Sequence, residues 1–143
     1  MNEIYGPADV VAGVIGFLRG HGIKASSKVP ATRGDGMVRV TRVGGQPRSF
    51  YEDEALILVE VWHTSHEASF DLARHVWGLV ASVSVDDQHA FPGLVVYKAT
   101  PDIPLQDPDE FAPDMDRHQL TINMHVRMEP MGGLYGASEA PAP

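Results

Sequence analysis

The sequence contains no cysteine, which excludes disulfides, cysteine-ligated zinc sites and thiol nucleophiles. No apolar run approaches the length of about 18 residues that a membrane-spanning helix needs. The first residues also lack the basic stretch and apolar core of a secretory leader. These absences predict a protein that folds in a cytoplasm and has no membrane partner. Its 143 residues, of which 43% are hydrophobic, predict a single domain with a sizeable core.

Positive charge is scarce as well, because 11 lysines and arginines stand against 19 acids and leave a net charge of −8. A dedicated nucleic-acid-binding protein normally carries a basic surplus, so this class is disfavoured. The charge is also polarised along the chain. Residues 19–48 hold seven bases and one acid, whereas residues 102–116 hold six acids and no base. These two segments are candidates for complementary contacts.

The centre of the sequence predicts a strand followed at once by a helix. Residues 55–62 are mostly apolar on both faces, which is typical of a strand in the middle of a sheet. Thr64, with Glu67 three residues later, matches a capping box. Apolar side chains then recur at helical spacing from Ala68 to Val83. We expect the helix to start where the strand ends.

Five further elements follow from the same reasoning. In chain order they are a helix from Pro7 to Gly20, a short strand within 23–30, strands at 37–43 and 93–100, and a final strand at 118–128. The order α-β-β-β-α-β-β predicts an α+β domain over residues 1–128. We expect one mostly antiparallel sheet of four to five strands, with both helices packed on a face.

Three segments lie between or beyond these elements. Residues 44–54 form a long connection, interpreted as a hairpin arm or a mobile loop. Residues 101–117 carry four prolines among acids and predict an irregular loop. Residues 129–143 form a Gly/Pro/Ala-rich extension that we expect to be disordered. The first two segments are the candidate working parts, because function concentrates in connections held by a rigid body.

Catalytic motifs are lacking, since neither a phosphate-binding loop nor a nucleophile elbow is present. His63 and His66, with Glu67 beside them and His75 further along the helix, are the best lead to a metal site. The first two histidines flank a backbone reversal, however, and His75 lies nine positions beyond His66. The simpler interpretation is polar residues at a helix start. We therefore predict no enzyme, no cofactor and no metal.

Phe50 and Tyr51 lie in the 44–54 connection, next to Arg48. Exposed aromatic side chains beside an arginine are typical of a protein contact. An alternative stays open, in which the two aromatic residues begin the next strand and close the core.

Together these patterns resemble a known family. The stretch "MVRVTRVGG", a short polar arm, "EALILVEVWHTSHEASFDLARHVWGLV", a Pro- and Asp-rich loop and "HQLTINMHVRM" follow one another. This combination resembles the tail terminator proteins of long-tailed bacteriophages, above all those of actinobacteriophages. The likeness runs from the first helix to the last strand and rests on the order of elements more than on fixed residues. It does not explain the 129–143 extension.

The resemblance implies a virion structural protein of the tail and neck, made in the host cytoplasm. In that family six copies form a ring that caps the tail tube, ends polymerisation of the major tail protein and presents the surface for head attachment. The implied partners are sister copies, the major tail protein and head-completion or connector proteins, with DNA only passing through the lumen. The family offers no catalytic residues.

A closed ring needs contacts in which two different faces of neighbouring subunits meet. On this interpretation the basic segment of one subunit meets the acidic segment of the next. The residues expected at the interface with sister subunits or the tube are Arg39, Arg42, Arg48, Phe50, Tyr51, Asp107, Asp109 and Glu110. A competing expectation places one of the three arginines at the lumen, facing DNA.

Two other function classes stay open. One is another neck component, such as a head-tail joining or tail-completion protein, which shares the small α+β architecture. The other is a small enzyme or metal-binding domain.

Overall fold

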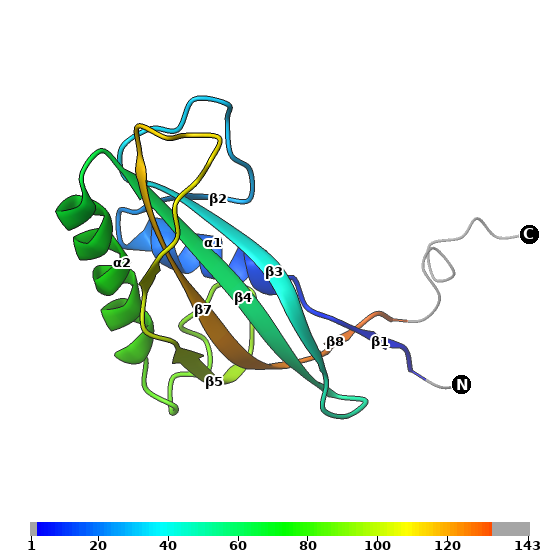
Figure 1. Cartoon of the computed structure of the whole chain (residues 1–143). Coiled ribbons are helices and arrows are strands. Elements are labelled where there is room, and N and C mark those ends of the chain that lie inside the picture. Colours follow the sequence, from blue (N-terminus) through cyan, green and yellow to red (C-terminus); the bar gives the residue numbers. More distant parts are fainter. Residues whose placement is uncertain (1–2, 133–143) are drawn as a thin grey trace, which may run out of the picture.

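A computed structural model describes residues 3–132 and contains one main sheet with two helices (Figure 1). The helices are α1 (Val10–Gly20) and α2 (His66–Ala81). The strands of the main sheet are β2 (Lys24–Ser26), β3 (Met37–Pro47), β4 (Glu52–His63), β5 (Val96–Pro101), β6 (Leu105–Gln106) and β7 (Asp116–Arg127). Two short strands, β1 (Tyr5–Gly6) and β8 (Glu129–Pro130), pair with each other. The predicted α+β class is confirmed.

The main sheet is larger than the four to five strands expected. Its strand order is β2-β3-β4-β7-β5, and β6 pairs with β7 as a sixth strand. All pairs are antiparallel except β2 with β3. The extra strand is only two residues long and sits inside the proline-containing segment, so no alternating pattern marks it in the sequence.

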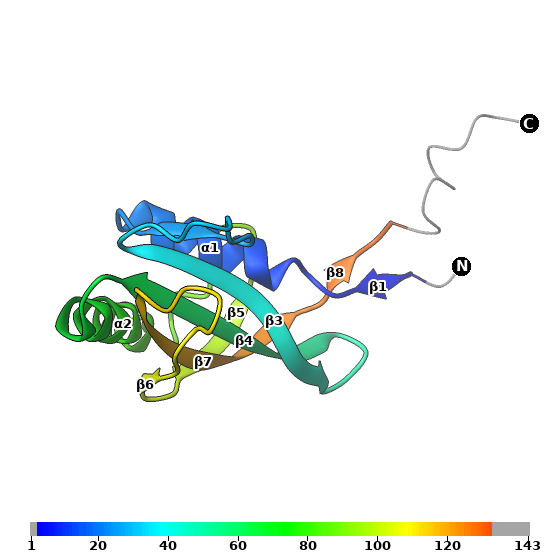
Figure 2. The same cartoon turned by 45° about the horizontal axis from the view of Figure 1, so that its top comes forward.

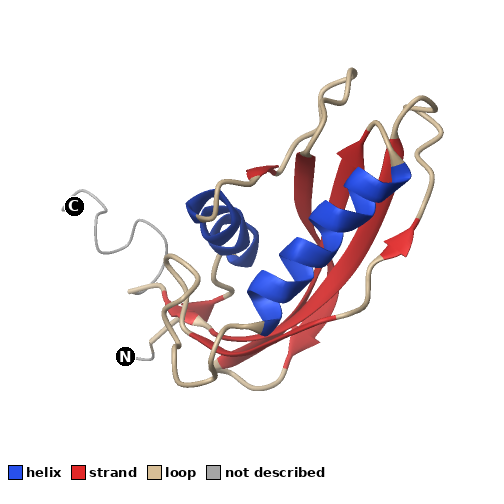
Figure 3. Cartoon of the chain, turned by 90° about the vertical axis from the view of Figure 1, so that its left-hand side faces the viewer, coloured by secondary structure: helices blue, strands red, loops and turns tan. Residues whose placement is uncertain are grey.

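Both helices lie on the same face of the sheet, as Figure 3 shows. Alternate residues of β4 point toward them and are fully buried, as the alternation predicts: Ala55, Ile57, Val59 and Val61. The neighbouring strands add Val38, Val40, Leu120, Ile122, Met124 and Val126 to the same core. The opposite face has no helix, and Leu56 and Leu58 remain half-buried there.

The helix starts are fixed by side-chain caps. The Asp9 carboxylate accepts a hydrogen bond from the Ala12 amide at the start of α1. At α2 the Ser65 hydroxyl accepts from the Ala68 amide, so the predicted Thr64 cap is wrong by one residue. The predicted box is also incomplete, because the Thr64 amide that Glu67 would bond donates instead to the Asp35 carboxylate. Ser65 then adopts the extended conformation that an N-cap requires.

The connection 44–54 is a hairpin arm and not a long loop. β3 continues to Pro47 and β4 begins at Glu52, so only four residues form the turn. The register shifts between Arg42 and Gly44, which marks a bulge. Figure 2 shows the resulting twisted arm reaching beyond the helices.

The C-terminal part of the described chain is better ordered than predicted. Glu129 and Pro130 pair with Gly6 and Tyr5 in a two-stranded ribbon, so the expected disorder is wrong for these residues. The remainder of the predicted extension, 133–143, lies outside the described residues. No helix between residues 3 and 132 is long and apolar enough to span a membrane.

Gly45 allows the arm to bend and provides a test of the hairpin geometry. It has φ of +98°, and an added Cβ would lie 2.0 Å from the Glu54 carbonyl oxygen across the hairpin. We expect Gly45→Ala to lower the free energy of unfolding by about 2–4 kcal/mol. The matched control is Gly44→Ala, whose Cβ would meet Leu56 at an ordinary 3.7 Å, and its expected cost is about 1 kcal/mol or less. Urea unfolding of both variants checks this, and equal losses would contradict it.

Candidate functional site

The predicted interface residues fall at two ends of the sheet and not on one surface. Arg39, Asp109 and Glu110 lie near the end of β4 that carries Trp62, and Asp107 pairs with Arg117 at the same end. Arg48, Phe50 and Tyr51 lie at the opposite end, in the β3–β4 turn (Figure 1). We call the residues that contact one another around Trp62 the tryptophan network. Arg48, Phe50 and Tyr51 are called the hairpin tip.

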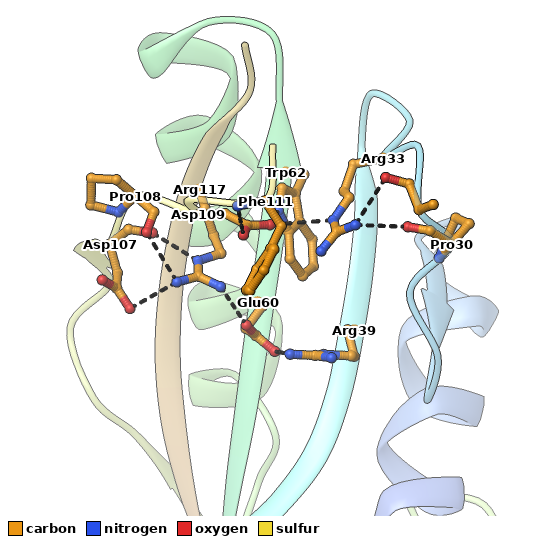
Figure 4. A network of polar contacts seen from close by, with 11 residues as sticks. Pro30, Arg33, Arg39, Glu60, Trp62, Asp107, Pro108, Asp109, Phe111 and Arg117 are labelled. Carbon is orange, nitrogen blue, oxygen red and sulfur yellow. Dashed lines mark hydrogen bonds and ion pairs between the residues drawn. The ribbon is translucent and has the colours of Figure 1, made fainter. Parts of the chain in front are cut away.

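Trp62 is the centre of the tryptophan network (Figure 4). It points away from the helices, yet it is only 1% exposed. Its indole N–H donates a 2.9 Å hydrogen bond to the Asp109 carboxylate, which comes from the 101–117 segment. That segment therefore folds back over the helix-free face and is held to β4 by a buried contact.

Three arginines surround the indole ring. The guanidinium carbons of Arg33, Arg39 and Arg117 lie 5.8, 5.9 and 5.8 Å from the ring centroid. These distances are within the range of a cation–π contact. Each arginine comes from a different part of the chain, so the indole ties together the 27–36 connection, β3 and the start of β7.

Buried carboxylates neutralise these arginines. Glu60 binds Arg39 at 2.6 Å through one oxygen and Arg117 at 3.0 Å through the other. Asp109 forms an ion pair with Arg33 at 3.2 Å and also accepts from the Phe111 amide at 3.0 Å. Arg117 further donates to the Asp107 backbone carbonyl and carboxylate. The network is therefore close to charge balance.

The environment of Asp109 sets its titration. Burial on its own raises the pKa of this carboxyl group. The hydrogen bonds from Trp62 and the Phe111 amide, with the charges of Arg33 and Arg117, outweigh burial and hold the pKa below its ordinary value. Asp109 therefore stays ionised inside the network at neutral pH.

This geometry weakens the case for the predicted charge pairing between subunits. Asp109 is 5% exposed and its carboxylate already contacts Arg33 of the same chain. Asp107 likewise pairs with Arg117, at 3.1 Å. The basic and acidic segments of the sequence meet within one subunit through the Arg33–Asp109 pair, and the Arg39–Glu60 and Arg117–Asp107 pairs join each segment to a charge outside both. Of the three predicted acids, only Glu110 remains exposed with no ion pair in the described chain.

Arg42 and Arg48 also have partners in the same chain. Arg42 makes a bidentate pair with the buried Asp53 carboxylate, at 2.6 and 2.9 Å. Arg48 lies 3.4 Å from Glu54 in an exposed and weaker pair. The first contact joins β3 to β4 and the second joins the turn to β4, so both stiffen the hairpin arm.

The aromatic residues of the hairpin tip are exposed. Phe50 is 61% and Tyr51 55% exposed, so the alternative in which they close the core is wrong. Their rings are 5.2 Å apart, and both pack edge-on against Tyr5, at 5.3 and 4.9 Å. Sequence reasoning missed Tyr5, because nothing local connects β1 with a turn some 45 residues later.

The 101–117 segment exposes apolar side chains in addition to acids. Ile103, Leu105 and Phe111 are all more than two thirds exposed. Ile103 and Leu105 lie beside the first half of β7 and Phe111 lies near Trp62, so the exposed apolar side chains follow the segment toward its anchored Asp109 end.

The histidines are arranged differently from the sequence-based lead. His63 pairs with Asp35 at 3.4 Å, and His75 is exposed on α2. His66 instead lies beside Asp116 and His118, which begin β7. The predicted set of His63, His66 and His75 is thus not brought together.

A scan of protein-family models and a search of curated proteins both return no match to this chain.

Asp109 provides the test of the network. Asp109→Asn keeps the shape and an acceptor for Trp62 but removes the charge, and we expect a loss of about 1–3 kcal/mol in the free energy of unfolding at pH 7. Because the pKa of Asp109 is lowered in the folded chain, its stabilisation is complete above about pH 4, the unfolded value. It is lost as pH falls through the folded pKa. The difference in the free energy of unfolding between wild type and Asp109→Asn should therefore shrink as the pH falls.

Urea unfolding at a series of pH values measures this difference. The control is Asp107→Asn, because its half-exposed ion pair with Arg117 should contribute less than about 1 kcal/mol. If the free energies of unfolding of wild type and Asp109→Asn differ by the same amount at every pH, the charge of Asp109 does not stabilise the network.

Proposed function

We propose that this chain is a virion structural protein that assembles into a ring on the end of a phage tail tube, ends its polymerisation and provides the head-attachment surface. In this proposal it performs no catalysis, and its partners are sister copies, the major tail protein and head-completion or connector proteins. The observation that carries the proposal is the aromatic cluster at the tip of a stiff hairpin arm, in which Phe50 and Tyr51 are exposed and pack against the half-buried Tyr5.

The cluster has the properties of a protein contact. Large aromatic side chains that become buried dominate the binding energy of interfaces. Here the three rings already pack against one another at centroid distances of 4.9–5.3 Å, so their orientation is set before any partner arrives. Preorganised side chains lose little conformational entropy on binding. An arm that projects such a cluster from the domain suits insertion against another protein.

Two unlike contact regions, the hairpin tip and the 101–117 segment, suit a ring. A closed ring of identical subunits needs one face of each copy to meet a different face of the next. The hairpin tip supplies one surface, and the apolar residues Ile103, Leu105 and Phe111 supply the other. We therefore replace the expected acid–base pairing by an apolar contact between these two surfaces, with Glu110 at its edge. A six-membered ring remains the expectation from the family resemblance.

The alternative is another neck component, a head-tail joining or tail-completion protein. The same two surfaces would serve such a protein, because it also binds ring-shaped neighbours. The stage at which assembly stops in its absence separates the two functions.

Removing the aromatic rings tests the contact directly. We expect Phe50→Ser with Tyr51→Ser to leave the fold stable but to weaken association with sister copies or with the tube protein at least tenfold, because the buried apolar area is lost. The control is Val85→Ser, which removes an equally exposed apolar side chain distant from the tip in the chain. Native mass spectrometry of the chain, alone and with the major tail protein, measures association. Unchanged complexes with the double variant would overturn the proposed role of the tip.

Particles assembled without the protein test the function itself. A terminator is expected to leave abnormally long tails without heads, because nothing stops tube growth. Filled heads beside tails of normal length would instead identify a joining protein. Electron microscopy of the assembly products distinguishes these outcomes, and normal virions would contradict both.

A further inference from the structure

Three metal-binding side chains meet where α2 begins and β7 begins. His66 is the first residue of α2, and Asp116 and His118 are the first and third residues of β7. One donor atom from each lies within 4.8 Å of the other two. The His66 Nδ1 is 3.8 Å from one Asp116 oxygen, and the His118 Nδ1 is 3.5 Å from the other. The two imidazole rings are themselves 4.9 Å apart.

These separations are close to those of a bound transition metal. A tetrahedral ion with nitrogen and oxygen ligands at about 2.0–2.1 Å holds its donor atoms about 3.4 Å apart. The two histidine–carboxylate distances already approach this value. Only the two imidazoles have to move closer, and the exposed His66 side chain is free to turn.

The carboxylate is held in place by a neighbour. The Gln106 side-chain amide donates to both Asp116 oxygens, at 3.1 and 3.2 Å. Outer groups that orient a ligand in this way are a regular feature of protein metal sites. Gln106 belongs to β6, so the cluster involves three elements.

His118 is fixed in place by its surroundings. Its buried side chain lies beside Ser69, whose hydroxyl is 2.7 Å from Nδ1, and beside the Phe70 ring, whose centroid is 5.6 Å away. A side chain that is already held in place loses little conformational entropy when it binds a ligand.

Two features oppose a cation here, and both can be accommodated. The start of α2 carries a partial positive charge, which the Asp116 carboxylate offsets. The Ser69 hydroxyl lies 2.7 Å from the His118 Nδ1 and would give up this bond to the metal. Ser69 can then donate to the carbonyl of the residue four positions earlier, as helical serines often do.

We propose that His66, Asp116 and His118 form a binding site for one divalent transition-metal ion of the zinc type. Two imidazoles and one carboxylate favour Zn²⁺, Co²⁺ or Ni²⁺ over Ca²⁺ and Mg²⁺, which prefer all-oxygen sites. Three protein ligands leave a coordination position for water or for a donor from another molecule. The site goes beyond the proposed assembly function and does not depend on it.

A bound ion would join the start of α2 to β7 at the point where the 101–117 segment ends. Ligands that bind only the folded state stabilise it by mass action. The ion would thus act beside the tryptophan network as a second anchor for the 101–117 segment, which is proposed to make contacts.

The test uses the full chain without an affinity tag, first stripped with a chelator and then titrated with Zn²⁺ or Co²⁺. We expect one ion per chain by calorimetry and native mass spectrometry, a raised Tm, and the visible absorption of Co²⁺ in a low-coordinate site. His66→Ala should weaken binding at least tenfold. The matched control His75→Ala removes an exposed histidine from the same helix and should bind as wild type.

His118 is buried, and its replacement also removes core packing, so the second variant is Asp116→Asn, which keeps the shape of the side chain. It should also weaken binding at least tenfold, with the circular dichroism spectrum unchanged. The proposal is overturned if micromolar Zn²⁺ fails to bind stoichiometrically. It is equally overturned if the His66 and His75 variants bind alike, or if Ca²⁺ binds more tightly than Zn²⁺.

Discussion

The buried contact between the Trp62 indole and the Asp109 carboxylate determines the shape of one whole end of this molecule. Between β5 and β7 only Leu105 and Gln106 belong to a strand, so the 101–117 segment depends largely on contacts such as this one and those of Arg117 with Asp107. A buried carboxylate is costly unless it is fully hydrogen-bonded and paired. Asp109 meets that condition through Trp62, the Phe111 amide and Arg33, so folding the segment onto the sheet is favourable only in this one arrangement.

β4 links this network to the hairpin tip. Trp62 lies one residue from the end of β4, and Tyr51 directly precedes its start, so one continuous strand separates the two regions. β4 is paired along its length with β3 on one side and β7 on the other. A central strand bonded on both sides is stiff, and it therefore fixes the spacing of the two exposed surfaces. Such a fixed spacing is what repeated contacts around a symmetric assembly require.

Local patterns predict the body of this fold but not what lies on its surface. Alternation placed β3, β4 and β7, yet it ended β3 early, because Gly44 and Gly45 shortly before Pro47 resemble a turn until the bulge between Arg42 and Gly44 is known. The Trp62–Asp109 contact joins residues 47 positions apart, and no periodicity records it. Glu60 was the sequence signal for a buried polar network at this end of β4, because a charged residue within an apolar strand requires a buried partner. The His66 cluster was hidden for the same reason, since the strand that carries Asp116 and His118 begins about 50 residues after the helix start.

The intramolecular ion pairs bear on the competing expectation that an arginine faces DNA. Arg39, Arg42 and Arg48 each contact a carboxylate of their own chain, and Glu60 and Asp53 are buried partners that cannot leave without a large cost. Every such pair removes one charge of each sign, so the net charge of −8 rests on carboxylates outside these pairs. If these three arginines lined the proposed lumen, a duplex would therefore meet positive charges that carboxylates of the same chain already pair. Weak binding favours passage, because a row of free arginines would hold the DNA by the release of its counterions.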